Sequence, residues 1–387
     1  MSPTRKPRIG RGLNLSRSRL RRWLILVPGG TLLFLLLLAF LHPYAFRTTL
    51  SYATRPLWDT LIYPSAPIIN LASAELFSSQ SPDYICRIHH STPRTKPVQL
   101  WDAIIFSHEL DMLEIHLAEL YDVVDQYIIL ESTVTYSGQP KSLHYKENAQ
   151  RYARFSDKIH YATFEGSDTA GFSFRPGDFA IETQQRGYMT DIINDLYRTS
   201  GAKPEEVLVL VADVDEIPYD HTLRLVKSCS LPPVLHLQLI PYVYSFEWIS
   251  GDLDSWHIQI HTWNPKSSYY KHSSKSTEDY ITSAGVHCSF CFARISEFQW
   301  KMKAYSHNDR LGDHPKALLR PERLQKAVCE GDNIFGMLPE AYTWWDLVTR
   351  WKGHQARRQT AVTPRLVKAQ PERFAYLLPG GCERPIE

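Results

Sequence analysis

The stretch VLVLVADVDEIP, from Val207 to Pro218, determines the fold that this sequence predicts. Five of its first six residues are branched aliphatics, and such a run is typical of a strand buried on both faces of a parallel sheet. In open α/β sheets the chemistry takes place at the carboxyl ends of the strands, where this run delivers Asp213, Asp215 and Glu216. Alternate residues of an extended segment share a face, so Asp213 and Asp215 are expected to point the same way.

Two carboxylates on one face predict a cation site. Hard oxygen ligands with open positions suit Mn²⁺ or Mg²⁺ bound to a substrate phosphate. Glu216, on the opposite face, is expected only to support these ligands. The alternative is that the acidic residues end the strand merely because they remain in water while their neighbours are buried.

The amino-terminal segment predicts a membrane anchor. Residues 1–22, the expected cytosolic tail, hold eight Lys or Arg and no acidic residue, and residues 23–41, the expected transmembrane helix, are uncharged. An apolar helix of this length spans about 28 Å, close to the hydrocarbon thickness of a bilayer, and its basic flank stays in the cytosol. A cleaved signal peptide is the alternative, but no small-x-small cleavage site follows. We therefore expect a single-pass type II protein of the Golgi or ER membrane, with the bulk of the chain in the lumen.

The rest of the chain divides by composition into three parts. Residues 42–98 contain seven prolines and little periodicity, which predicts a stem. Residues 99–345 are the expected folded domain, and residues 346–387 are a carboxyl-terminal extension. From residue 100 to residue 130 a strand, a helix and a second strand follow one another, which is a βαβ unit. The domain is therefore predicted to be an α/β fold with a mixed, mainly parallel sheet.

Charge and cysteine content limit the class of protein further. The chain has 43 Lys plus Arg against 41 Asp plus Glu, and eight of the basic residues belong to the amino-terminal segment. The expected lumenal part is therefore acidic, which argues against a nucleic-acid partner. Six cysteines in a lumenal chain predict disulfides. Cys288 and Cys291 are expected to form a local disulfide or to be structural thiols, in preference to a zinc site with His287 and His272.

Six segments carry a resemblance to a known family. They are, in chain order, WDAIIFSHELDMLEIHLAELYDVVDQYIILES, TYSGQPK, VADVDEIP, PYVYSFEW, AGVHCSFCF and KMKAYSHND. In this order and spacing, from about residue 99 to residue 340, the chain resembles glycosyltransferase family 17, the family of β-1,4-mannosyl-glycoprotein 4-β-N-acetylglucosaminyltransferase. The resemblance implies a GT-A type nucleotide-sugar fold, a UDP-sugar donor, a divalent cation and inversion at the anomeric carbon. Family members often carry Trp where this chain has Val286, which leaves the acceptor open.

The resemblance also implies a reaction and a set of site residues. The reaction is transfer of N-acetylglucosamine from UDP-N-acetylglucosamine to a mannose residue of an N-glycan or a related glycan. Asp213 and Asp215 match the family's acidic motif for the metal and the diphosphate. A later histidine is the expected third ligand, and His307 is preferred to His287, which adjoins two cysteines. Independently of the resemblance, donor contacts are expected from acidic residues near the strand ends and from two basic residues, namely Glu109, Asp111, Glu131, Arg186 and Lys158. For the three acidic residues the alternative is an ordinary solvated acid at a strand end or helix start.

Residues for the acceptor side come from the second half of the domain. An inverting displacement needs a base within hydrogen-bond reach of the attacking hydroxyl, and the candidates are Asp309, Glu247 and Asp313. Broad aromatic side chains with a polar tip suit sugar rings, and the candidates are Trp248, Tyr244 and Trp256. Glu182 and Arg186, one helical turn apart, are expected to form a surface ion pair rather than a phosphate clamp.

Two other classes of protein fit parts of the pattern. A non-catalytic lumenal glycan-binding protein would keep the same fold and the aromatic residues. A phosphatase of the haloacid dehalogenase type also places an Asp-x-Asp motif after a strand, but it requires that strand to be the first of its domain. Here two predicted strands precede it.

Overall fold

The computed structural model describes residues 17–58, 66–166, 179–203, 205–250, 258–270, 276–337, 355–356 and 363–387, together with the single residues 344 and 348. Its contacts divide the chain into two units, one ending at Ser51 and one beginning at Tyr52. The first unit holds α1 (Arg17–Leu41) and the first half of α2 (Pro43–Trp58). Among the described residues no single helix is both long and apolar enough to cross a bilayer, whereas Leu26–Leu41 and α2, which meet at a bend of 119°, satisfy that criterion together.

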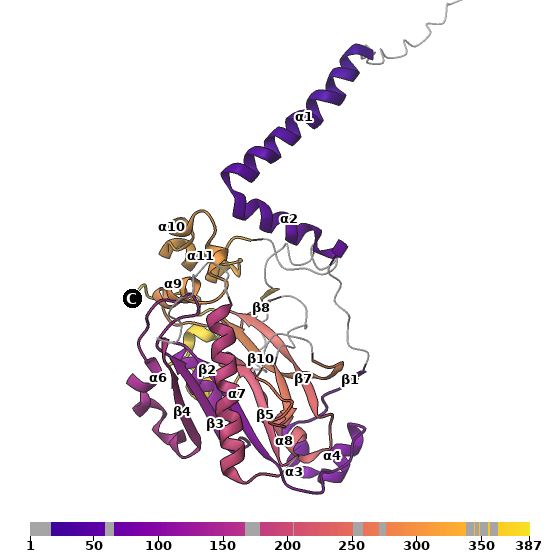
Figure 1. Cartoon of the computed structure of the whole chain (residues 1–387), viewed down its shortest axis with the longest axis vertical. Helices are drawn as coiled ribbons and strands as arrows, with labels where there is room; N and C mark the ends of the chain where they lie inside the picture. The colour runs from indigo at the N-terminus through magenta and orange to yellow at the C-terminus, as the bar shows by residue number, and fades with distance from the viewer. Residues whose placement is uncertain are drawn as a thin grey trace, which may run out of the picture. The chain divides into compact units, whose positions relative to one another are not determined.

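The second unit is built on one large sheet, so the predicted α/β fold with a mostly parallel sheet is confirmed (Figure 1). Along its main path only β9 runs antiparallel to its two neighbours. The other neighbouring pairs on that path are parallel. The order of the strands is β1 (Ala66–Ile68), β10 (Asp279–Ser289), β7 (Val234–Val243), β9 (Gln259–Thr262), β5 (Val207–Asp213), β2 (Gln99–Phe106), β3 (Gln126–Ser132) and β4 (Ile159–Phe164).

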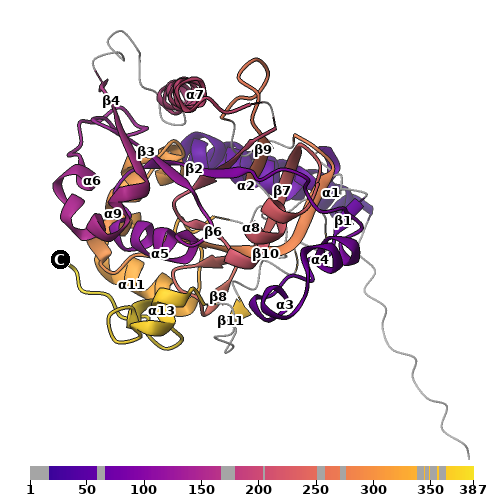
Figure 2. The same ribbon diagram turned by 90° about the horizontal axis from the view of Figure 1, so that it is seen from below.

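The side chains of β5 are apolar on both faces of the sheet, and helices cover both faces. Leu208 and Leu210 belong to the hydrophobic cluster that includes residues of α5 (Leu110–Leu120). The intervening valines, such as Val209, belong to a separate cluster with residues of α7 (Ala180–Ser200). Figure 2 shows these two helices on opposite sides of the sheet. Since successive side chains of a strand point to opposite faces, a continuous apolar run is what such a central strand requires.

Shorter elements connect these strands and extend the sheet. β6 pairs antiparallel with β10, β8 pairs with β7, and β11 pairs with β8. The bounds of the remaining elements are α3 (Ala74–Ser79), α4 (Pro82–Ile88), α6 (His144–Glu147), η1 (Ala149–Lys158), β6 (Glu216–Pro218), α8 (Asp220–Ser228), β8 (Trp248–Ile249), α9 (Ile295–Ala304), η3 (Asn308–Leu311), α10 (Pro315–Leu318), α11 (Pro321–Glu330), β11 (Gln355–Ala356), α13 (Arg365–Ala369) and η4 (Ala375–Leu377).

The amino-terminal boundary of the folded unit differs from the predicted one. Residues 66–98, expected in a stem, are part of the domain, because β1 pairs in parallel with β10 and closes the sheet on that side. Asn70 Nδ2 donates to Thr222 Oγ1 over 3.0 Å, and Cys86 is bonded to Cys229. Prolines indicate a stem only where nothing else fixes the backbone, and here strand pairing and a disulfide fix it.

The carboxyl-terminal segment is also part of the domain and not a separate extension. Cys382 is bonded to Cys329 of α11, and Arg365 of α13 donates its amide N–H to Glu119 of α5 over 2.7 Å. The buried guanidinium of Arg384 donates to the backbone carbonyls of Phe292 and Tyr244 over 2.7 and 3.1 Å. The six cysteines thus form three disulfides, and the predicted local disulfide between Cys288 and Cys291 is confirmed.

Candidate active site

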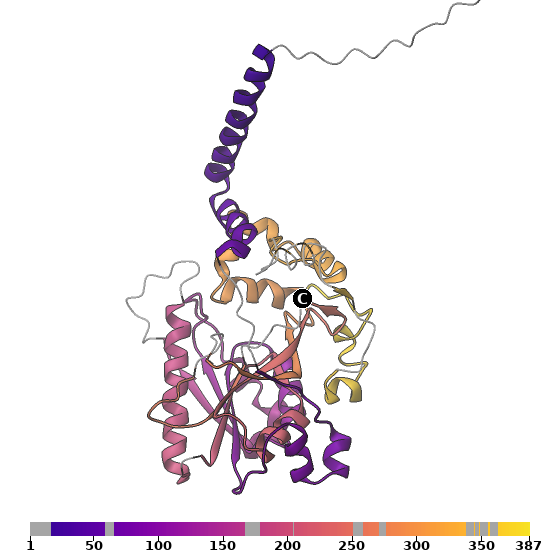
Figure 3. The same cartoon turned by 90° about the vertical axis from the view of Figure 1, so that its right-hand side faces the viewer.

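The site is built at the edge where the parallel strands end. Ile105 of β2 is in register with Asp213 of β5, so the residues that follow β2 lie beside the acidic segment that follows β5. The chain then returns as β6, in which Glu216 pairs with His287 of β10. Figure 3 shows α9 lying across this end of the sheet. Side chains from three strands and one helix therefore meet here.

A buried ion pair between His116 and Asp102 fixes the backbone of the acidic segment, which runs from Asp213 to Glu216. His116 of α5 contacts the carbonyl oxygen of Val214 through Nδ1 at 3.0 Å and Asp102 Oδ2 of β2 through Nε2 at 2.9 Å. Both side chains are fully buried. Burial lowers the pKa of His116, but the charge and hydrogen bond of Asp102 outweigh it and the net pKa is raised. Because both ring nitrogens face acceptors, the imidazole is held in its charged form.

A second contact fixes the same segment from within. The carboxylate of Glu216 accepts a hydrogen bond from the backbone amide of Asp213 over 3.0 Å. Glu216 is only 1% exposed, so it supports the turn instead of facing a substrate. The backbone amide of Cys288 donates to the carbonyl of Asp215 over 2.9 Å. The backbone at Asp213, Val214 and Asp215 is thus held by Glu216, His116 and Cys288 respectively.

Lys301 of α9 is at the centre of the site, and sequence reasoning missed it. Its Nζ lies 3.2 Å from Glu109 Oε1 and 3.2 Å from Asp215 Oδ2. Burial raises the pKa of Glu109, but the neighbouring His108 and Lys301 outweigh it and hold the pKa well below its usual range. Burial likewise lowers the pKa of Lys301, and the two carboxylates more than reverse this effect. The only signal in the sequence is that Lys301 begins the motif KMKAYSHND.

His108 completes this group on the side of β2. Its ring packs against those of Phe292 and Trp300, with centroid distances of 5.0 and 4.0 Å, and its Nδ1 is 3.5 Å from Glu109 Oε2. The backbone amide of His108 also donates to Glu109 Oε2 over 3.0 Å. The carboxylate of Glu109 is therefore anchored by its neighbours at one oxygen and by Lys301 at the other.

Asp213 faces a separate group on the α7 side of the site. Glu182 and Arg186 form the predicted ion pair, but their side chains are only 15% and 16% exposed, so the pair is not at the surface. Burial lowers the pKa of Arg186, but the charges of Glu182 and Asp213 outweigh it and raise the pKa. Ser306, which precedes η3, also bonds to Glu182. Of the two basic residues expected to contact the donor, Arg186 is thus brought to the acidic segment.

The two candidate histidines occupy different positions. His287 Nε2 is 3.7 Å from Asp215 Oδ1, whereas the ring of His307 packs against Phe179 and Tyr305, with centroid distances of 5.0 and 5.6 Å. The structure therefore brings His287, and not the preferred His307, against Asp215. Within the described part of the chain no three His, Cys, Asp or Glu side chains form a ready-made metal site.

The chemistry of the ligands nevertheless fits one kind of metal site. Asp213 and Asp215 are hard oxygen donors at a strand end, and His287 adjoins one of them. Mg²⁺ and similar ions are commonly held by one or two carboxylates, with water and substrate phosphates as the other ligands. The residues present therefore suit a cation that a diphosphate helps to bind, rather than a cage made by the protein alone.

Two further residues expected to contact the donor, Glu131 and Lys158, are engaged elsewhere. Glu131 is buried, and its oxygens accept from the backbone amides of Tyr145 and Lys146 and from the hydroxyl of Tyr161. Lys158 lies at the opposite, amino end of β4 and donates to the carbonyls of Tyr121 and Val124 over 2.6 and 2.8 Å.

Asp111, in the first turn of α5, joins that helix to the carboxyl-terminal segment. It pairs with Arg151 and accepts from the hydroxyl of Tyr376 over 2.7 Å. Of the three carboxylates predicted around the first two strand ends, only Glu109 therefore belongs to the group around Lys301.

The candidate bases are spread over the domain. Asp309 lies on η3, next to the segment whose Ser306 bonds to Glu182. Glu247 accepts from the backbone amide of Gly380 over 2.9 Å and so helps to hold the carboxyl-terminal segment. Asp313 is exposed beyond η3. Asp309 is the candidate whose element adjoins the site.

Two of the aromatic residues expected to bind the acceptor, Tyr244 and Trp248, are described, and both pack in or against the core around α9. Tyr244 is 1% exposed, belongs to the core around α9 and donates to the carbonyl of Asp332 over 2.5 Å. Trp248 of β8 packs on that core beside Gly331, where an added Cβ would lie only 2.6 Å from the indole. Trp256 lies outside the described residues.

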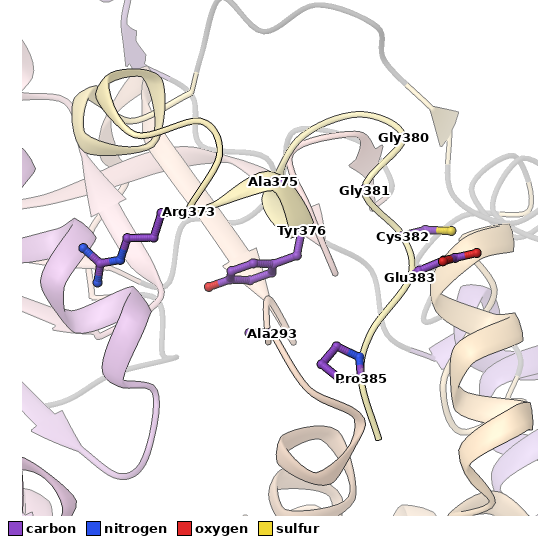
Figure 4. Close-up of a pocket in the computed structure, with 9 residues that line it drawn as sticks. All are labelled: Ala293, Arg373, Ala375, Tyr376, Gly380, Gly381, Cys382, Glu383 and Pro385. Carbon is purple, nitrogen blue, oxygen red and sulfur yellow. The ribbon is translucent and has the colours of Figure 1, made fainter. Parts of the chain in front are cut away.

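A pocket of about 480 Å³ lies in the carboxyl-terminal segment (Figure 4). Arg373 and Tyr376 line it from one side, and Cys382 and Glu383 from the other. None of the residues that line it comes from the groups around Lys301 and Asp213. It is therefore distinct from the candidate active site.

Replacing both Cys288 and Cys291 with serine should lower stability without abolishing turnover, because this disulfide only closes a tight loop beside His287. The chain-entropy model gives a loss of about 2 kcal/mol for so small a loop. Denaturant unfolding and turnover of the same preparation measure the two effects. The pair Cys329 and Cys382, which are 53 residues apart, is the control and should cost more stability. A fully stable but inactive Cys288/Cys291 double variant would contradict a structural role.

Comparison with known proteins places the chain among sugar-transferring enzymes. The sequence profile of Glycosyltransferase family 17 matches residues 22–385. The chain is 24% identical over 231 residues to the β-1,4-mannosyl-glycoprotein 4-β-N-acetylglucosaminyltransferases of Rattus norvegicus and Homo sapiens, over 52% of this chain and 41% and 42% of those proteins. The aligned segment thus spans about two fifths of the length of the curated relatives.

A solved structure was also found to be similar. It is a mannosyltransferase from Pyrobaculum calidifontis in complex with GDP-mannose and Mn²⁺, with 15% identity and a TM-score of 0.23. The similarity covers 51% of this chain and 47% of that one. A TM-score this low supports no inference about this chain.

Proposed function

Because the chain belongs to glycosyltransferase family 17, we propose that it transfers N-acetylglucosamine from UDP-N-acetylglucosamine to a mannose residue of an N-glycan or a related glycan. Glycosyl transfer as the class of reaction follows from the family. The proposal adds the identity of the donor, the need for a cation, the identity of the acceptor and inversion at the anomeric carbon. It includes a GT-A type fold, in which the donor lies at the carboxyl ends of β2 and β5.

The observation that carries the proposal is the charge of this edge. Among the described residues, the carboxylates of Glu109, Glu182, Asp213, Asp215 and Glu216 lie with the cationic side chains of Arg186 and Lys301, while the charged His116 is paired with Asp102. A diphosphate alone would be repelled by the carboxylates of Asp213 and Asp215, since two unit charges 4 Å apart interact by about 4 kcal/mol at an effective dielectric of 20. Binding of a nucleoside diphosphate at this edge therefore calls for a divalent cation.

Mn²⁺, or Mg²⁺ in its place, would supply positive charge to the leaving UDP when bound. Asp213 and Asp215 would hold it, with His287 beside Asp215, and Arg186 would offset the charge of Asp213 from the α7 side. His116 and Glu216 would keep the two aspartates in place through Val214 and the amide of Asp213. Preorganised charge of this kind stabilises a transition state without reorganising as the bond breaks.

The base that takes the acceptor proton is proposed to be Asp309. It is carried by η3, whose preceding residue Ser306 bonds to Glu182 of the Asp213 group. Glu247 already accepts a backbone hydrogen bond in the carboxyl-terminal segment, and Asp313 is exposed beyond η3. A general base must lie within hydrogen-bond reach of the hydroxyl that it activates. Asp309 is the candidate nearest in sequence to Ser306, which bonds to Glu182.

Incubation of the purified full chain with Mn²⁺ and a panel of UDP- and GDP-sugars tests this function. Nucleotide release should be fastest with UDP-N-acetylglucosamine and should require a mannosyl acceptor. Preference for a GDP-sugar would contradict the donor. Glycan binding with no nucleotide release would favour a glycan-binding protein, and hydrolysis of a phosphomonoester would favour a phosphatase. A preparation of Asp215→Asn provides the background.

We also propose that the chain is a single-pass type II protein of the Golgi or ER membrane, anchored by residues 23–41. Protease added to sealed microsomes should leave a carboxyl-terminal tag intact, because a basic flank favours the cytosolic side. The same tag should be digested once detergent opens the vesicles. Digestion of the tag in sealed vesicles would show the opposite orientation. The domain would then have no access to nucleotide sugar in the lumen.

A further inference from the structure

Lys301 bridges two carboxylates that come from different strand ends. Its Nζ is 3.2 Å from Asp215 Oδ2 and 3.2 Å from Glu109 Oε1, and the three side chains are 16%, 9% and 9% exposed. The rings of Phe290 and Phe292 flank the ammonium at 5.4 and 5.5 Å. An ammonium group has three donors on one small centre, so it can donate to both carboxylates at once and offset one of their two charges.

This contact conflicts with a divalent cation bound at Asp215. Oδ2 of Asp215 is already paired with Lys301, and Oδ1 lies 3.7 Å from His287. A cation approaching this carboxylate meets the ammonium as a like charge in a mostly buried site, where such charges interact strongly. The cation must therefore share the carboxylate of Asp215 with Lys301 or displace Lys301 from it.

A diphosphate arriving with the cation resolves the conflict. Its oxygens offer the ammonium a new anionic partner at the edge of the site, while Glu109 Oε1 still holds the same lysine. The cation and the diphosphate would then assist each other. The diphosphate draws away the ammonium that opposes the cation, and the cation offsets the carboxylates that oppose the diphosphate. Coupling of this kind is reciprocal and is measured as a change in affinity.

We propose that Lys301 occupies the place of the divalent cation at Asp215 in the donor-free enzyme, so that the cation and the nucleoside diphosphate bind tightly only together. This inference rests on the proposed function, since it takes Asp215 as a metal ligand. It adds that Lys301 is a positioning residue that couples the two ligands. The donor-free enzyme then binds Mn²⁺ weakly.

The experiment measures binding of Mn²⁺ to the full chain with and without UDP, in the wild type and in Lys301→Met. In the wild type, UDP should raise the affinity for Mn²⁺ by about tenfold or more. In Lys301→Met the affinity for Mn²⁺ alone should rise by about tenfold and the effect of UDP should shrink. Lys301→Arg keeps the positive charge and should behave like the wild type. Lys303→Met, an exposed lysine on the same helix, is the matched control and should change nothing.

The outcomes separate this inference from the proposed function. If Asp215→Asn binds Mn²⁺ as the wild type does, the metal site itself is misplaced and the proposed function fails there. If Asp215→Asn loses Mn²⁺ but Lys301→Met binds Mn²⁺ alone no more tightly than the wild type, only the role of Lys301 is overturned. Thermal unfolding in EDTA shows which variants are folded, and Lys301→Gln replaces Lys301→Met if the latter is not.

Discussion

Asp213→Asn and Asp215→Asn are each expected to lower turnover about a thousandfold while the protein stays folded. Asparagine keeps the shape of the side chain but removes a charged ligand for the cation. A loss of about 4 kcal/mol in transition-state stabilisation corresponds to this factor. Turnover measured against manganese concentration checks it, and a higher metal requirement in the variants would identify the lost interaction.

Glu216→Gln is the matched control for these two substitutions. Its side chain is buried and accepts the amide of Asp213, a hydrogen bond that a glutamine oxygen also accepts. Turnover should therefore fall much less than in the aspartate variants. Full activity of the wild type in EDTA, or unchanged turnover in Asp215→Asn, would remove the cation from the mechanism. The acidic run would then be only a solvated end of a strand.

His116→Leu is expected to destabilise the protein by about 3–5 kcal/mol, because it leaves Asp102 as an unpaired charge inside the core. Asp102 is fully buried, and its Oδ1 has no hydrogen-bond partner among the described residues, so it depends on His116. The carbonyl of Val214 loses its partner at the same time. Denaturant unfolding measures the loss of stability.

The double variant Asp102→Leu/His116→Leu separates stability from catalysis. Buried ion pairs are often replaced by apolar residues at little cost, so stability should largely return. Turnover should stay low, because Val214, between the two aspartates, remains unanchored. In the wild type the contribution of the pair is complete below the ordinary histidine pKa of 6.5 and declines as pH rises through the raised pKa of His116. If turnover recovered together with stability, His116 would have no role in positioning the aspartates.

The sequence was sufficient to predict those features that depend on local pattern. The apolar run from Val207 predicted a central parallel strand, and the spacing of Cys288 and Cys291 predicted a local disulfide. The strand and helix that follow residue 100 were also placed correctly. Each of these signals is contained in a few consecutive residues.

The residues that sequence reasoning missed are brought to the site by packing. Lys301 reaches Asp215 and Glu109 only because α9 lies across the ends of β2 and β5, and no spacing in the sequence indicates that arrangement. For the same reason Glu182 and Arg186 were expected at the surface, although the pair is mostly buried beside Asp213. Glu131 lies near the end of β3, but helix α6, which follows, donates the backbone amides of Tyr145 and Lys146 to its oxygens.

The pairing of β1 with β10 determines how much of the chain a shortened, secretable form must keep. A truncation that begins at residue 90 would remove β1 and Cys86, leaving Cys229 as a free thiol. The part of β10 from Asp279 to Ile281 would then present unpaired backbone groups to other molecules, and exposed edges of this kind template aggregation. A shortened form that starts before Ala66 keeps both the covering strand and the disulfide. Low yield from a shorter version would thus report a damaged sheet edge and would say nothing about catalysis.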